Sequence, residues 1–324
     1  MRSRTTWARP PFWKVFLAFA IIYIVWGSTY LAIRVGVREF PPFLMAGLRF
    51  TSAGAAMWAW MRVTGVPAPN RREWRGALLL GTLMFLIDYA CLFWAETRVP
   101  SGIAAVILAM IPVTITLLEI AFLRTQRLTA RLGFGLVVGM IGVAVLMNPG
   151  ASLGEAPIDP KGAVALLVSC CGWSVGTIVT KRLALPESKA MSAAAQMLCG
   201  GVQLLLLAAI AGEFAGFHPQ AISRTAWFSL VYLIVFGSII AFTAYVWLLH
   251  YESPTKVGTY AYVNPVVAVI LGALLGGEAV GRRTGVGTAL ILAGVIVITT
   301  AKATLARRDA RLDRAEEPAR LTAE

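Results

Sequence analysis

The chain contains two stretches of similar design, one in each half. In residues 100–142 an apolar run with Pro112 near its middle is followed by a basic turn and by a second apolar run rich in small residues. Residues 254–294 repeat this order, with Pro265 in the place of Pro112 and three glycines at matching positions: Gly133, Gly135 and Gly142 correspond to Gly285, Gly287 and Gly294. A chain made of two copies of one unit is organised by the relation between the copies, so this repeat constrains the fold more than any other feature.

The repeated runs are apolar enough to lie in a lipid bilayer. Of the 324 residues, 58% are hydrophobic and 14% are charged, whereas a soluble domain carries about 25% charged residues. A helix needs about 20 apolar residues to cross the hydrocarbon core, and lipid offers no partner to an open backbone, so each long apolar run is expected to be a transmembrane helix. Ten runs qualify: 13–33, 41–61, 76–96, 100–123, 131–148, 161–181, 190–212, 225–249, 254–277 and 284–302. The expected fold class is all-α integral membrane, with ten transmembrane helices.

Five spans in each copy would place the second copy upside down relative to the first. Matches outside the glycine-rich runs support the duplication: Trp26 and Arg34 correspond to Trp173 and Lys181, and Gly54 corresponds to Gly201. We expect a first five-helix repeat in 1–148, a linker in 149–160, a second repeat in 161–302 and a tail in 303–324. Most Lys and Arg side chains then fall on one side of the membrane, so the positive-inside rule predicts a multi-pass protein of the cytoplasmic (inner) membrane with both termini in the cytoplasm.

Two inverted five-helix repeats are typical of secondary transporters, which bind their substrate near the middle of the membrane between the halves. A passive channel or facilitator without ion coupling would show the same helical pattern and stays an alternative. A polytopic membrane enzyme would need clustered His, Cys or carboxylate groups, but His218 and His250 are the only histidines and lie far apart without an HExxH motif. The chain has no phosphate-binding Walker loop, so a solute or ion gradient would have to drive transport.

Neither cofactor nor metal is expected. The four cysteines all lie inside apolar runs and lack metal-ligand spacing: Cys91, Cys170, Cys171 and Cys199. The formal net charge of +13 would suggest nucleic acid in a soluble protein. Here the positive charges lie mainly in the loops between spans, so they predict orientation in the lipid bilayer and no nucleic-acid partner.

Several separate motifs resemble those of one transporter family. They are WGSTYLAIR (26–34), PPFLMAGLRF (41–50), FWAETRVPSGIAAVILAMIP (93–112), the Leu128–Thr129 turn, the pair Trp173–Ser174, the pair Asn264–Pro265, and Gly277 with Glu278. In this order the motifs resemble the EamA-type carriers of the drug/metabolite transporter superfamily, over about residues 15–302. The resemblance implies a ten-helix inverted repeat that moves small organic solutes, often outward, through a pocket lined by both halves.

The resemblance sets the expected partners and shows one departure. The substrate would be a small molecule such as an amino acid, an amphipathic metabolite or a drug-like solute, possible coupling would use protons, and the protein would be a monomer or a homodimer. Members commonly have an acidic residue before the Leu-Thr turn in both halves. In this chain the position is occupied by Glu278 in the second half but by the uncharged Gln126 in the first. This departure favours a structural, helix-capping use of Glu278.

Ionisable residues inside the spans are the first candidates for function, because a charge at mid-membrane costs about 2.5–3.5 kcal/mol. Asp88 and Glu96 lie eight residues apart in the third span and would share a helix face. They could form a proton-binding or cation-attracting pair at the mouth of the pocket; alternatively Asp88 caps or pairs locally and Glu96 meets water. Arg49 lies deep in the second span, where a structural salt bridge or a reach to the interface is the expected role.

Helix breaks and polar aromatic residues supply the remaining candidates. Pro112 and the pair Asn264–Pro265 interrupt matching spans, and paired breaks of this kind point to the substrate site of a transporter, although they could be simple kinks. Aromatic residues inside spans must place an N–H or O–H against a partner, so they could bind an amphipathic solute or only pack in the core. The predicted substrate-binding residues are Trp26, Tyr89, Trp173, Ser174, Tyr245, Tyr262 and Asn264.

Overall fold

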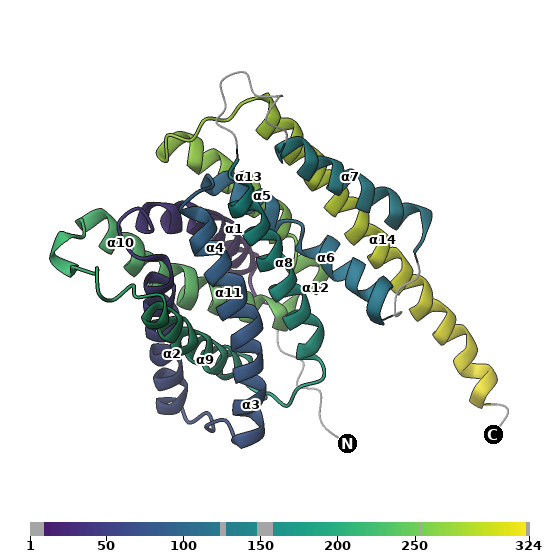
Figure 1. The fold of residues 1–324 in the computed structure, drawn as a ribbon. Helices are drawn as coiled ribbons and strands as arrows, with labels where there is room; N and C mark the ends of the chain where they lie inside the picture. The colour runs from purple at the N-terminus through teal and green to yellow at the C-terminus, as the bar shows by residue number, and fades with distance from the viewer. Residues whose placement is uncertain (1–9, 124–127, 148–157, 253, 322–324) are drawn as a thin grey trace.

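The computed structural model describes residues 10–123, 128–147, 158–252 and 254–321, and every regular element in these ranges is a helix (Figure 1). The first half begins with α1 (Phe12–Gly36) and α2 (Pro42–Val63). Its third span is α3 (Arg71–Leu80), the π-helix η1 (Gly81–Ile87) and α4 (Asp88–Glu96). The fourth is α5 (Ser101–Leu108), α6 (Ile111–Leu118) and η2 (Glu119–Leu123), and the fifth is α7 (Ala130–Met147).

The second half follows the same plan. It contains α8 (Pro160–Thr180), α9 (Lys189–Ile210), a short 3-10 turn η4 (Pro219–Ala221), and a span made of α10 (Arg224–Tyr232), the π-helix η5 (Leu233–Ile240) and α11 (Ala241–Tyr251). The ninth span is α12 (Pro254–Val257) with α13 (Tyr260–Leu275), and the last is α14 (Arg282–Leu321). Of the ten helical units in the described ranges, seven are long and apolar enough to cross a membrane; α7 and α13 are apolar but shorter, and α2 has 22 residues.

Glycines show how the two halves are related. A Cβ atom on Gly54 of α2 would lie 2.7 Å from the backbone nitrogen of Leu198 in α9, and one on Gly201 of α9 would meet Thr51 of α2 in the same way. In the repeat, Gly54 corresponds to Gly201 and Thr51 corresponds to Leu198. Each helix therefore makes the same contact with the other, which is the pattern expected for two units related by a two-fold axis. Since the contacting residue numbers rise in one helix while they fall in the other, α2 and α9 are antiparallel.

The pair α7 and α14 repeats this relation along one flank of the molecule (Figure 1). A Cβ atom on Gly135 would lie 3.0 Å from the carbonyl oxygen of Gly294, and one on Gly142 would lie 3.0 Å from that of Gly287. These four glycines are the matched positions of the sequence repeat, and their backbones can approach closely because they carry no side chain. The prediction of ten helices in two inverted repeats is confirmed.

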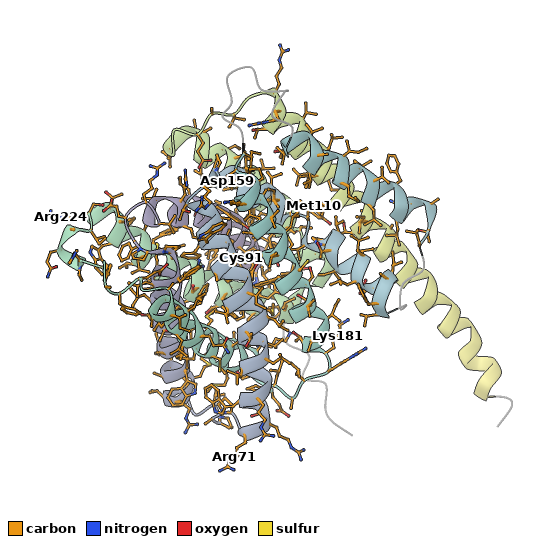
Figure 2. All side chains as sticks on the ribbon, viewed as in Figure 1. Arg71, Cys91, Met110, Asp159, Lys181 and Arg224 are labelled. Carbon is orange, nitrogen blue, oxygen red and sulfur yellow. The ribbon has the colours of Figure 1, made fainter. Side chains whose placement is uncertain are left out.

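The remaining spans pack in matched pairs. Helix α1 contacts α13 and the span α10–η5–α11, while its counterpart α8 contacts α6 and the span α3–η1–α4. Arg71 and Lys181 lie at one end of the bundle and Asp159 lies at the other (Figure 2). Helix α14 runs on to Leu321, so most of the predicted tail 303–324 continues the last helix rather than forming a separate element. The predicted linker 149–160 lies largely outside the described residues.

One predicted helix break is displaced. The fourth span breaks at Ala109 and Met110, just before Pro112, which stands in the first turn of α6 where its missing N–H costs no hydrogen bond. In the ninth span the interruption lies between Val257 and Tyr260, and α13 continues through Pro265. The prediction that Pro265 breaks its helix is therefore wrong, and the two interruptions do not occupy matching positions.

Candidate functional site

Two of the three π-helices in the described residues, η1 and η5, lie next to buried polar residues. Stretches of this kind inside α-helices occur frequently at functional sites. The π-helices η1 and η5 occupy matching positions in the third and eighth spans, and η5 packs against α1 and α2 of the other half. Gly237 and Ser238 lie in η5, while Asp88 and Tyr89 directly follow η1. The site is therefore built where the halves meet.

Arg49 lies in this interface and is only 3% exposed. Its Nε donates a hydrogen bond to Ser238 Oγ at 3.0 Å, which joins α2 to η5. The guanidinium carbon lies 4.6 Å from the ring centroid of Phe50 and 5.3 Å from that of Tyr89, so the cation rests on two aromatic rings. Among the described residues, Nη1 of Arg49 has no hydrogen-bond partner and the side chain forms no ion pair, which contradicts the expected salt bridge.

Three aromatic side chains form a second part of the site, here called the aromatic cluster: Trp26, Tyr245 and Tyr260. The ring centroid of Trp26 lies 5.4 Å from that of Tyr245 and 4.9 Å from that of Tyr260, and the two tyrosine rings are 6.1 Å apart. Two of the three were predicted as site residues. Tyr260 joins them because α13 begins at this residue, after an interruption that the sequence pattern placed at Pro265.

Gly237 connects Arg49 with the aromatic cluster. Its carbonyl oxygen accepts a hydrogen bond of 3.0 Å from the indole Nε1 of Trp26. A Cβ atom at this position would lie 3.0 Å from Cγ2 of Thr29 and 3.2 Å from Nη2 of Arg49, so only glycine lets the guanidinium come this close. Sequence reasoning missed Gly237 and Ser238, because both belong to a span whose apolar run gave no sign of a π-helix.

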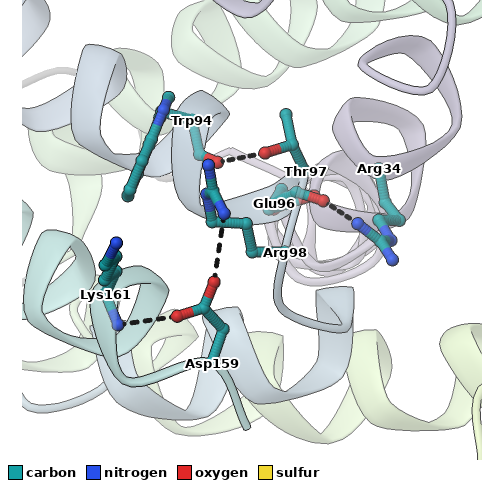
Figure 3. Close-up of polar contacts among 7 residues, drawn as sticks. All are labelled: Arg34, Trp94, Glu96, Thr97, Arg98, Asp159 and Lys161. Atoms are coloured by element: carbon teal, nitrogen blue, oxygen red, sulfur yellow. Dashed lines mark hydrogen bonds and ion pairs between the residues drawn. The ribbon is translucent and has the colours of Figure 1, made fainter.

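The two buried acids have different neighbours. Asp88 is 2% exposed, and its carboxylate accepts a hydrogen bond from the hydroxyl of Ser169 in α8. Glu96 is fully buried, so the alternative that it meets water is wrong. The guanidinium of Arg34 donates to the backbone carbonyl of Glu96 (Figure 3), while both carboxylate oxygens of Glu96 lack a hydrogen-bond partner among the described residues. Asp88 thus faces the second half, whereas Glu96 lies beside α1.

Four further predicted residues lie outside the aromatic cluster. Tyr262 donates from its hydroxyl to Oγ1 of Thr299, so it faces α14. The side-chain amide of Asn264, with its nitrogen as donor, lies 3.2 Å from the backbone carbonyls of both Tyr23 and Tyr260 and joins α1 to α13. Ser174 Oγ is 3.4 Å from the carbonyl oxygen of Ile111, and the neighbouring Trp173 is half-buried on α8.

Glutamates close one end of the bundle. Glu278 accepts hydrogen bonds from Ser101 N (2.7 Å), Ser101 Oγ (2.7 Å) and Gly102 N (3.0 Å) at the start of α5. Carboxylates are favourable at helix N-termini, where backbone N–H groups lack partners within the helix. The capping use inferred for Glu278 is confirmed, and it caps a helix of the opposite half. Gln126, its counterpart, lies outside the described residues.

Two more glutamates make similar contacts between the halves. Glu213 accepts from the backbone nitrogens of Leu44 (2.7 Å) and Phe43 (3.3 Å) in α2, and partial burial raises its pKa. Glu39 accepts from Ser223 N (2.6 Å) and Ser223 Oγ (2.7 Å) before α10, and these hydrogen bonds lower its pKa. We call the contacts of Glu39, Glu213 and Glu278 the glutamate clamps.

An exposed ion pair lies at the same end. Arg98 Nη1 is 3.2 Å from Asp159 Oδ2, and the backbone nitrogen of Lys161 donates to the same carboxylate (Figure 3). The Lys161 hydrogen bond is the main cause of the lowered pKa of Asp159. Within the described part of the chain, no three His, Cys, Asp or Glu side chains are grouped to hold a metal ion.

Comparison with known proteins identifies the family. The sequence profile of the EamA-like transporter family matches residues 13–148 and again 160–300, one match for each half. The chain belongs to the EamA-like transporter family. The two matched ranges agree with the internal duplication of the sequence. Together with the membrane-spanning helices, the family match assigns the protein a transporter role in a membrane.

Individual relatives agree with this assignment. The chain is 37% identical over 290 residues to the inner membrane transporter YedA of Escherichia coli (strain K12), covering 89% of this chain and 91% of that one. It is 29% identical over 291 residues to a probable amino-acid metabolite efflux pump of Salmonella typhimurium (strain LT2), covering 87% and 93%. A crystal structure with 24% sequence identity and a TM-score of 0.61 covers 90% of this chain and 98% of that one, so the two chains share a fold.

Proposed function

We propose that the protein is a secondary carrier that exports a small organic metabolite across the cytoplasmic membrane by alternating access. The observation that carries this proposal is the position of the site. Arg49 and Trp26 of the first half converge on Gly237 and Ser238 of the second half, so a solute held there would touch both halves at once. Relative rotation of the halves would then change the side of the membrane to which the solute is exposed.

The glutamate clamps supply the contacts that such a rotation must break. Each one joins a carboxylate of one half to a helix start of the other half, and all lie at one end of the bundle. The distribution of Lys and Arg in the sequence predicts that this end faces outward and that both termini are cytoplasmic. The described conformation is then closed toward the outside, and opening of the clamps releases the cargo outward.

The remaining site residues take roles within this scheme. Trp26, Tyr89, Trp173, Ser174, Tyr245, Tyr262 and Asn264 line the route of the solute, and the interruptions near Pro112 and in the span of Pro265 allow their helices to bend. Asp88 and Glu96 exchange protons when the site changes sides, which couples export to the proton gradient. Buried carboxylates between helices are suited to this use, because protonation removes the cost of their burial. The name of the Salmonella typhimurium relative supports an amino acid or a related metabolite as cargo.

Counterflow in proteoliposomes tests the carrier mechanism. Vesicles containing the purified protein are loaded with an unlabelled amino acid mixture, and the uptake of trace labelled amino acids is followed. A carrier accumulates label transiently above its equilibrium level, since its reoriented site exchanges cargo, and it saturates with concentration. Flux that neither saturates nor shows counterflow would support a passive channel, and absence of any flux would refute the transport proposal for these solutes.

A further inference from the structure

We infer that the cargo carries a carboxylate and that Arg49 binds it. The inference rests on the proposed function and names the chemical class of its substrate. A guanidinium has five N–H donors, and the described contacts occupy only Nε, through Ser238. Nη1 is fully buried and has no acceptor in the described part of the chain, which is costly for a charged donor. An acceptor with negative charge, brought by the cargo, would remove this cost.

The surroundings of Arg49 hold the cation but offer its Nη1 no hydrogen-bond acceptor among the described residues. The rings of Phe50 and Tyr89 attract the charge through their faces, yet a ring face replaces no hydrogen-bond acceptor. Asp88 is engaged by Ser169 on another helix, and Glu96 acts on Arg49 only through space, without an ion pair. The geometry of a guanidinium fork matches a carboxylate, which can accept two parallel hydrogen bonds from it.

The charges around Arg49 also limit the net charge of the cargo. Arg49 supplies one positive charge, the carboxyl group of Glu96 acts on it through space, and Asp88 directly precedes Tyr89, whose ring faces the guanidinium. A cargo with a single negative charge is matched by Arg49 alone, whereas a dianionic phosphate would leave a negative charge uncompensated near these acids. The geometry therefore favours a monocarboxylate over a phosphate ester.

The aromatic cluster specifies the other end of the cargo. The indole of Trp26 donates to the carbonyl oxygen of Gly237, and Nη2 of Arg49 would lie 3.2 Å from a Cβ atom on Gly237. The aromatic cluster, which Trp26 forms with Tyr245 and Tyr260, therefore lies next to the guanidinium. Aromatic faces bind apolar and aromatic groups by burial of apolar surface and by ring contacts. The expected cargo is an amphipathic monocarboxylate, with its carboxylate on Arg49 and its apolar group on the aromatic cluster.

Three ligands with one skeleton test this inference in the purified full-length protein: L-phenylalanine, its carboxamide, and its phosphonate analogue. A ligand that binds the folded state raises the melting temperature by mass action, so titration yields an apparent affinity for each. We expect the carboxylate to bind roughly 10- to 100-fold more tightly than the carboxamide, because a hydrogen-bonded charge is replaced by a neutral group. Tighter binding of the phosphonate than of the carboxylate would overturn the choice of a monocarboxylate.

Variants assign the preference to Arg49. Arg49→Met keeps an unbranched stem without the guanidinium and should remove the preference for carboxylate over carboxamide, while Arg49→Lys should retain part of it. Arg62→Met is the matched control, since Arg62 lies on the same helix, is exposed, and should leave the preference unchanged. Equal binding of acid and amide by the unmodified protein, or an unchanged preference in Arg49→Met, would overturn the inference. Counterflow of labelled amino acids would still be observed in that case if the carrier proposal holds, so the two failures are distinguishable.

Discussion

Glutamine in place of Glu278 tests whether the glutamate clamps hold one end of the carrier closed. The carboxylate accepts three hydrogen bonds, and a side-chain amide can keep the two that end on one oxygen but presents an N–H group to Gly102 N. Hydrogen bonds to a charged acceptor contribute about 1.5–3 kcal/mol each, against about 0.5–1.5 kcal/mol for neutral pairs. Because Glu278 is half-exposed and water screens part of this difference, we take a net loss of about 2 kcal/mol.

A loss of this size should shift the equilibrium between closed and open ends roughly 30-fold toward the open end. The assay is the distance distribution between spin labels at Thr97 and Ala279, which are exposed and belong to opposite halves, after replacement of the four native cysteines. Glu278→Gln should enlarge the population at long distance.

Glu73→Gln is the matched control, since Glu73 caps its own helix within the first half. It should leave the distance distribution as it is. An unchanged distribution in Glu278→Gln would refute the assignment of Glu278 as a clamp between the halves.

Three further predictions concern the other clamps and the packing between the halves. The pKa of Glu39 is lowered in the folded protein, so the stabilisation that its carboxylate contributes is complete above the usual glutamate pKa of about 4.5 and is lost as the pH falls through the lowered value. Spin-label distances should therefore lengthen on acidification. This response should be smaller in Glu39→Gln. Gly237→Ala should reduce counterflow at least about tenfold, because its methyl group would displace Thr29 and Arg49. The control variant Gly216→Ala, whose added methyl group would contact nothing, should transport normally. Equal counterflow rates in the two variants would contradict the site geometry. Gly54→Ala should lower the free energy of unfolding by about 1–3 kcal/mol through its clash with α9, measured by thermal unfolding against Gly285→Ala, where the space is open.

The spans and the inversion could be predicted from the sequence, because the length of apolar runs and the matched glycines report directly on bilayer crossing and on close helix contact. The prediction of a helix break at Pro265 is wrong, because neighbouring helices can stabilise a helix that continues through a proline. The same sequence reasoning identified Arg49, Trp26 and Tyr245 as candidates from their chemistry inside apolar runs.

The rest of the site depends on contacts that no local pattern records. Gly237 and Ser238 bind Trp26 and Arg49 across about two hundred residues of chain, through a π-helix whose sequence LIVFGSII reads as an ordinary apolar run. Glu39 and Glu213 lie in loops, where carboxylates are common, and only the arrangement of the halves brings each one to a helix start of the other half. Their role could not have been predicted before the fold was known.

A reversible cross-link across a glutamate clamp tests the central claim most directly. Glu39 and Ser223 are in contact between the halves, so cysteines at these two positions in a cysteine-free background can be joined by a short, reducible dithiol-reactive reagent. If export requires the halves to separate at this end, cross-linked protein in proteoliposomes should lose counterflow, and reduction should restore it. Counterflow at the full rate while the cross-link is intact would contradict the account.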